Sequence, residues 1–147
     1  MLYLTVTIAF LFVIGSVMWL RPSPADKRLA NLRQCAVQSG LRVNWLSSKD
    51  VEWLQQPSKR WVRYAYLRPQ QRESLMRLRW LRDANGWQPK SHLQALTSDF
   101  GLPVSVEAIE VTAHDCAVVW SESGTEDDVK RIAEALKQLA EVKFKSA

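Results

Sequence analysis

The chain begins with twenty residues that carry no charged side chain, MLYLTVTIAFLFVIGSVMWL. Twenty residues in an α-helix rise about 30 Å, which matches the thickness of the hydrocarbon layer of a bilayer. A cleaved secretory signal is the competing interpretation, but it needs a basic start, a shorter apolar stretch and small residues before its cleavage site. Here bulky residues fill positions 17–20. We therefore expect residues 1–20 to form a single transmembrane helix.

The charges beside this segment predict its orientation. No Lys or Arg precedes it, whereas Arg21, Lys27, Arg28 and Arg33 follow closely. Lys and Arg that flank a membrane span stay on the cytoplasmic side. We expect a single-pass protein of the cell inner membrane, with its N-terminus outside and its C-terminal domain in the cytoplasm.

Small residues interrupt the bulky span at Gly15 and Ser16. Small residues let a neighbouring helix approach closely, which makes this pair a candidate site for transmembrane association. The GxxxG spacing is absent, so simple exposure of the helix to lipid is the alternative.

Residues 21–147 are long enough for one soluble domain with its own core. Hydrophobic periodicity divides this domain into a juxtamembrane helix within 21–40, sheet-forming hairpins within 41–120 and a C-terminal helix over 125–140. Capping signals support both helices. Ser23, Pro24 and Asp26 form a typical helix start, and Thr125 precedes three acidic residues that suit the positive end of a helix.

Between the helices, alternating apolar and polar residues predict antiparallel strands. Asn85-Gly86 is the commonest two-residue hairpin turn, and a short helix is expected over 92–99. The sequence therefore predicts an α+β domain with a mainly antiparallel sheet and two or three helices packed on one face. The expected strands are 41–46, 60–68, 75–82, 108–112 and 116–120.

Charge is divided unevenly along the domain. Residues 59–97 hold nine cationic and two acidic residues, whereas residues 98–147 hold five cationic and ten acidic ones. Such a division indicates an electrostatic footprint rather than an evenly mixed surface.

Arginine dominates the basic block and alternates with aromatic residues. Its guanidinium group binds phosphate or carboxylate oxygens in pairs and stacks on aromatic rings. If Arg63, Arg77 and Arg79 share one face of a sheet, they form a platform for an anion. In the alternative, the arginines pair with acidic residues of the same chain, such as Glu126, Asp127, Asp128 and Glu134. The predicted anion- or partner-binding residues are Arg60, Arg63, Arg68, Arg77, Arg79, Arg82, Trp61 and Trp80.

Signatures of catalysis, metal binding and cofactor binding are missing from the sequence. His92 and His114 have no metal-ligand spacing, and no Gly-rich phosphate loop or CxxC motif is present. The sequence His114-Asp115-Cys116 holds the residue types of a triad, but adjacent residues on a strand point in different directions. We expect Asp115 to shape a turn and the two cysteines to be reduced, partly buried thiols. Glu107, Glu110 and Glu122 could supply paired carboxylates, but exposed strand positions explain these residues equally well.

These observations predict a non-enzymatic membrane protein whose cytoplasmic domain binds a protein partner. We expect it to be an accessory or scaffolding subunit of a bacterial inner-membrane complex, with no cofactor and no metal. The alternative is a sensor of anionic lipid head groups or nucleic acid that uses the Arg/Trp-rich block. Nucleic acid is the weaker target because no recognised binding motif is present. An enzyme with an unsignalled site is the least favoured reading.

Overall fold

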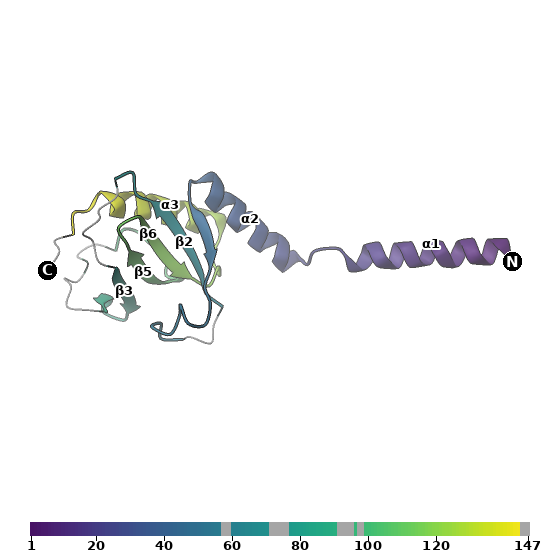
Figure 1. Cartoon of the computed structure of the whole chain (residues 1–147), viewed down its shortest axis with the longest axis horizontal. Coiled ribbons are helices and arrows are strands. Elements are labelled where there is room, and N and C mark those ends of the chain that lie inside the picture. Colours follow the sequence, from purple (N-terminus) through teal and green to yellow (C-terminus); the bar gives the residue numbers. More distant parts are fainter. Residues whose placement is uncertain (57–59, 71–76, 91–95, 97–98, 145–147) are drawn as a thin grey trace. The chain divides into compact units, whose positions relative to one another are not determined.

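The computed structural model describes residues 1–56, 60–70, 77–90, 96 and 99–144. The chain forms two compact units, Met1–Ala30 and Asn31–Ala147, and we treat each by itself. Figure 1 gives the elements of both.

The first unit contains helix α1, Leu2–Trp19, every residue of which is exposed. By length and composition this helix can cross a membrane, a criterion that signal sequences also meet. The polar residues of α1 bond to their own helix: the hydroxyls of Thr5, Thr7 and Ser16 each donate to a carbonyl oxygen four residues earlier. The helix therefore presents an almost wholly apolar surface, and these three hydroxyls are satisfied within it.

Helix α2, Pro24–Gln38, starts as the sequence predicts. The hydroxyl of Ser23 accepts from the amide of Asp26 at 3.1 Å, and the carboxylate of Asp26 accepts from the amide of Ser23 at 3.2 Å. Hydrogen bonds that the Ser23 hydroxyl and amide donate to the carboxylate lower the pKa of Asp26. The helix ends before Gly40, whose φ of +83° suits glycine.

The second unit is built on one antiparallel sheet of six strands in the order β1-β2-β6-β5-β3-β4. With three helices in the described chain, the domain is α+β, as expected. Strands β2 and β3, neighbours in the sequence, are separated in the sheet by β6 and β5. The strands are β1 Arg42–Trp45, β2 Val62–Leu67, β3 Leu78–Asp83, β4 Gly86–Pro89, β5 Val106–Val111 and β6 Asp115–Trp120.

Both predicted hairpins are present, but the turn of the first lies one residue earlier than predicted. The β3–β4 hairpin turns through Ala84 and Asn85, because Asp83 already pairs with Gly86. Gly86 is thus the first residue of β4 rather than part of the turn, and its φ of +111° explains why glycine stands there. The helix expected over 92–99 falls mainly outside the described residues.

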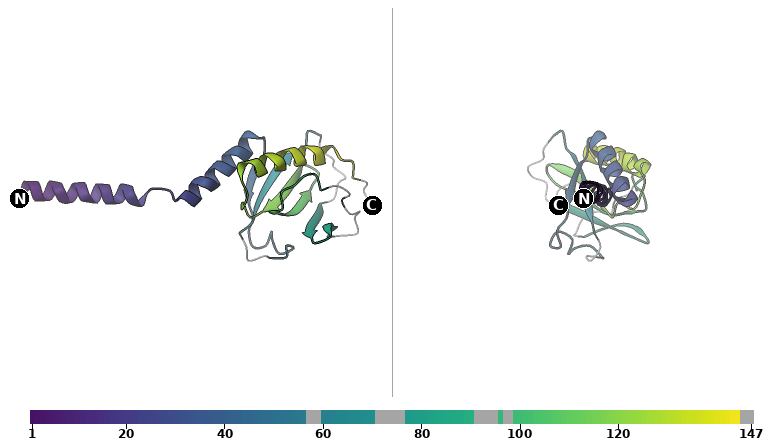
Figure 2. Two further views of the ribbon diagram at one scale, coloured as in Figure 1. Left: turned by 180° about the vertical axis from the view of Figure 1, so that it is seen from behind. Right: turned by 90° about the vertical axis from the view of Figure 1, so that its right-hand side faces the viewer.

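One face of the sheet is covered by helix α3, Glu126–Glu141, which packs against β2 and β6. Figure 2 shows α3 lying along this face of the domain. The buried side of α3 includes Val129, Ile132 and Leu136. In the sheet, the rings of Tyr64 and Trp120 meet edge to face, with 5.2 Å between their centroids. Thr125 caps the start of α3 as predicted, and with Asp128 it forms a capping box.

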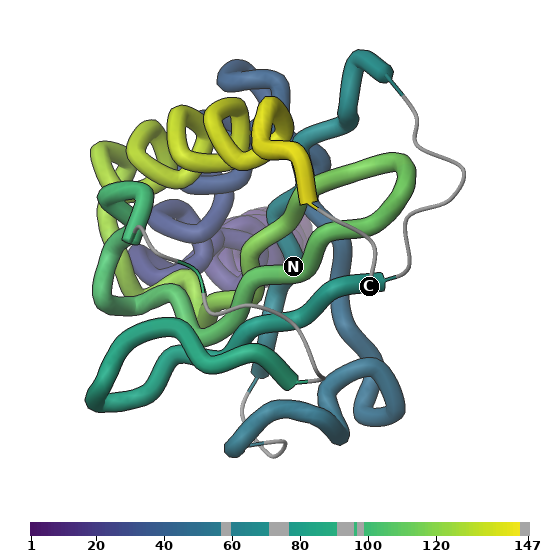
Figure 3. The backbone as a smooth tube through the Cα atoms, turned by 90° about the vertical axis from the view of Figure 1, so that its left-hand side faces the viewer, coloured from purple at the N-terminus to yellow at the C-terminus, as the bar shows by residue number. Residues whose placement is uncertain are grey.

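The opposite face of the sheet is only partly covered. Residues 46–56, which follow β1, fold back over it, and Val51 and Leu54 pack with Trp61, Ala108 and Val119 in an apolar cluster. Figure 3 shows this segment on the side of the sheet away from α3. The rest of this face, which we call the open face, carries the charged side chains discussed below.

A buried polar cluster joins α2 to the end of β6. Glu122 is 2% exposed and has a φ of 56°, and its carboxylate accepts from Arg33 at 2.6 and 2.9 Å and from the Tyr64 hydroxyl at 2.8 Å. Burial and the bond to Glu122 raise the pKa of Tyr64 well above its usual value. Glu122 is therefore a buried ion-pair partner and not the exposed strand residue that the sequence suggests.

Candidate functional site

A cleft of about 400 Å³ lies on the open face, beside the segment that folds back over the sheet. One wall comes from that segment, through Leu46, Asp50 and Trp53, and the floor comes from the sheet. Such a volume falls within the range of small-molecule and peptide-side-chain sites. The sheet side is lined by Arg63, Arg77, Arg79, Glu110, Thr112, His114, Asp115 and Val119.

The floor of the cleft is a network of two arginines and two carboxylates. Arg63 on β2 reaches across β6 and donates to Glu110 on β5 at 3.1 Å and to both carboxylate oxygens of Asp115 at 2.8 and 2.9 Å. Arg79 on β3 donates to the other oxygen of Glu110 at 2.8 Å. Ala117, which pairs with Glu110, is small enough to leave room for this crossing. The network thus ties four strands together across their side chains.

Burial makes this network more than a surface ion pair. Glu110 is 7% exposed, and the side chains of Arg63 and Asp115 are 12% and 18% exposed. Burial by itself opposes ionisation of Asp115, yet the hydrogen bonds from Arg63 and Thr112 hold its pKa below the usual value. The pKa of Arg63 is raised: burial lowers it, and its bonds to Asp115 and Glu110 more than offset this.

The rim of the cleft holds the groups that remain accessible. The side chain of Arg77 is 62% exposed and its Nε lies 3.9 Å from Glu110, so it is only loosely paired. His114 is also exposed. The guanidinium of Arg79 stacks on the ring of Trp53 at 4.5 Å, which fixes one wall of the cleft. Arg77 is therefore the arginine of this cleft most available to a ligand.

A third carboxylate, that of Asp50, lies in the wall of the cleft. Asp50 accepts from the hydroxyl and the amide of Ser47 at 2.7 and 3.0 Å. These bonds lower the pKa of Asp50, and the charges of Arg77 and Arg79 add to the effect. With Glu110 and Asp115 it balances the three arginines, so the charges that line the cleft sum to zero with His114 neutral.

The predicted residue set therefore separates in space. The structure brings Arg63, Arg77 and Arg79 into one cleft on one face, which was the condition for a binding platform. It also pairs them with acidic residues of the same chain, but these come from β5 and β6 rather than from α3. Asp127 of α3 instead lies 3.9 Å from Lys130.

The other predicted binding residues lie elsewhere. Arg60 is exposed two residues before β2, and Arg68, just after β2, is buried against the end of α3. Arg82 donates to the Leu102 carbonyl and stacks on Trp87. Trp61 belongs to the apolar cluster under residues 51–54. Trp80 is buried and packs against Phe144.

A pattern in the sequence predicts which of these residues lie on the same face of the sheet. Side chains alternate between the two faces of a strand. The odd-numbered Arg63 and Arg79 share the open face, whereas Trp80 and Arg82 belong to the even-numbered set of β3. Glu110 and Trp53 were missed because their roles depend on pairing between strands far apart in the sequence.

Residues of the triad type do not form a catalytic arrangement. Cys116 is fully buried, His114 is exposed, and Asp115 is bound to Arg63 on the open face. Burial raises the pKa of Cys116 to about 11. Within the described ranges, no group of three or more His, Cys, Asp or Glu residues could hold a metal ion.

Comparison with models of known protein families, with curated proteins and with solved structures gave no match.

Proposed function

We propose that this chain is a membrane-anchored, non-enzymatic binding module whose cleft on the open face holds an acidic segment of a protein partner. The partner is a subunit of the same membrane complex, to which this chain is an accessory. The observation that carries the proposal is the convergence of Arg63, Arg77 and Arg79 in one cleft with Trp53.

The neutrality of the cleft favours a protein partner over lipid or nucleic acid. Attraction to a membrane surface or to a phosphate backbone grows with the excess of cations. Here three arginines face three carboxylates, so the long-range attraction is small. A polypeptide segment offers both donors and acceptors at short range, and its carboxylate fits the loosely paired guanidinium of Arg77.

The anchor in this proposal is α1, which spans the inner membrane with its N-terminus outside. Its exposed apolar surface and the cations after it support this arrangement. The domain then lies on the cytoplasmic side. The test is labelling of single cysteines in intact cells with an impermeant reagent, in a chain whose own cysteines are replaced by serine. A cysteine added before Leu2 is expected to react, and one at the exposed position Lys130 is not.

Partner binding is tested by co-purification of the full chain in mild detergent at physiological salt. Arg77→Glu is expected to release the partner. Arg60→Glu is the matched control, because Arg60 is exposed on the same block of sequence but does not line the cleft. A monomer with no retained partner contradicts the proposal, as does equal loss of the partner in both variants.

A further inference from the structure

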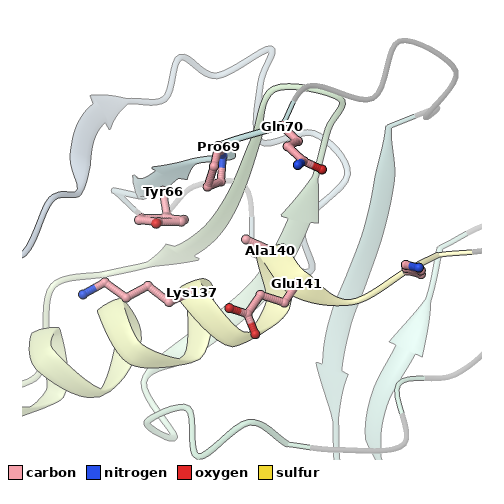
Figure 4. A pocket seen from close by; sticks show the side chains of 7 residues that line it. Tyr66, Pro69, Gln70, Lys137, Ala140 and Glu141 are labelled. Atoms are coloured by element: carbon pink, nitrogen blue, oxygen red, sulfur yellow. The ribbon is translucent and has the colours of Figure 1, made fainter.

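A second cleft, of about 490 Å³, lies on the other side of the sheet, where the end of β2 meets the last turns of α3. Figure 4 shows Tyr66 across the cleft from Lys137, with the ammonium end of Lys137 lying away from the Glu141 carboxylate. This cleft shares no residue with the cleft on the open face. It is lined by Tyr66, Pro69, Gln70, Lys137, Ala140, Glu141 and Lys143.

A buried cation, Arg68, is 5% exposed and lies beside this cleft, since it bonds to Ala140 in the lining. One terminal nitrogen of its guanidinium donates to the carbonyl oxygens of Ala140 at 3.3 Å and Val142 at 3.5 Å, where α3 ends. The other terminal nitrogen is buried without a hydrogen-bond partner. No carboxylate is paired with Arg68 in the part of the chain that the structure describes.

A buried guanidinium is costly unless an opposite charge compensates it. The carbonyl groups at the end of a helix carry a partial negative charge equivalent to roughly half an electron, which compensates Arg68 only in part. The region therefore keeps unbalanced positive charge, and the cleft is where a counter-charge from outside the chain can approach.

The residues around the cleft increase this imbalance. Lys137 and Lys143 are exposed cations at its border, and among the residues that the structure describes Glu141 is the one acid that lines it. With Arg68 beside the cleft, three cations stand against one carboxylate, an excess of two. A phosphate monoester carries about −1.5 to −2 charges near neutral pH, which matches this excess, and the phosphodiester of a lipid head group carries about −1, which balances half of it. The hydroxyl of Tyr66 and the amide of Gln70 can donate hydrogen bonds to its oxygens.

We propose that this second cleft binds a phosphate group, carried either by a small soluble phosphate compound or by an anionic lipid head group. Lys137 and Lys143 contact the phosphate, and Tyr66 and Gln70 orient it. Arg68 does not touch the ligand and contributes only its positive charge, from behind Ala140. This site is independent of the partner-binding cleft.

The proposal is tested by titration of the isotopically labelled full chain in zwitterionic detergent, followed by amide chemical shifts. The probes are inorganic phosphate, short-chain phosphatidylglycerol and short-chain phosphatidylcholine. Shifts concentrated at Tyr66, Gln70 and Ala140 are expected. Saturation by inorganic phosphate identifies a soluble phosphate site, and saturation by phosphatidylglycerol alone identifies a lipid head group.

The matched variants change exposed side chains only, so loss of folding does not confuse the result. Replacement of both Lys137 and Lys143 by glutamine is expected to weaken binding roughly tenfold or more, because two charge-assisted contacts are lost. Lys130→Gln, on the same helix but outside the cleft, is expected to leave it unchanged. Absence of saturable binding by the phosphate and phosphatidylglycerol probes, or an unchanged affinity in the double variant, overturns the proposal.

Discussion

Replacing Glu110 by glutamine removes the carboxylate that two arginines share on the open face of the sheet. The wild-type side chain accepts from Arg63 at 3.1 Å and from Arg79 at 2.8 Å and is 7% exposed. Breaking a fully buried ion pair costs about 3–5 kcal/mol because the remaining charge is left uncompensated. The cost here is smaller, since Arg63 keeps Asp115 and the side chain of Arg79 is 27% exposed. We expect a loss of about 2–3 kcal/mol in the free energy of unfolding.

The assay is unfolding of the domain by guanidinium chloride in the full chain, held in mild detergent and followed by tryptophan fluorescence. Glu107→Gln is the matched control, because Glu107 lies on the same strand and no ion pair involves it within the described ranges. The control is expected to cost less than about 0.5 kcal/mol. A similar small loss for Glu110→Gln would refute the view that this network stabilises the sheet.

Three further predictions concern the domain. The pKa of Asp115 is depressed in the folded state, so its contribution to the free energy of unfolding is present above its unfolded pKa of about 4 and is lost as the pH falls through the folded value. Measured at pH 7 and pH 3, the free energy of unfolding should fall less for Asp115→Asn than for the wild type. Thr125→Ala is expected to lower the free energy of unfolding by about 1 kcal/mol, because the amide of Asp128 loses its acceptor, whereas Thr125→Ser restores it in the same denaturation assay. The Cys116 thiol has a pKa of about 11, so roughly one part in a thousand is thiolate at pH 8. An aromatic disulfide reagent should therefore modify this buried thiol only after denaturant is added. Rapid modification of Cys116 in the native protein would contradict its burial.

Local features of the fold follow from the sequence because their causes are local. Ser23 and Asp26 start α2 as a capping box, and Thr125 does the same for α3, since capping needs only residues three positions apart. The apolar residues of 108–112 and 116–120 predict two strands with a turn at 113–115, and the structure has β5 and β6 within two residues of these bounds. These elements and the α+β class are confirmed.

Features that depend on contacts between distant segments did not follow. The placement of β6 and β5 between β2 and β3 is a matter of long-range pairing, which periodicity does not encode. Glu110 was expected to be exposed, yet it is buried because β5 is central and Arg63 lies across it. Likewise, α3 supplies a buried environment for Arg68 that no pattern within 60–68 reveals.

We propose that the cleft on the open face holds a partner while α1 holds the chain in the membrane. The most direct test is photo-crosslinking in intact membranes from an unnatural amino acid at position 77, with position 131 on the exposed side of α3 as the reference. We predict one discrete adduct from position 77, recovered with the membrane fraction, and none from position 131. No adduct from position 77, or recovery of the chain in the soluble fraction as a form that starts after Leu20, would contradict the account.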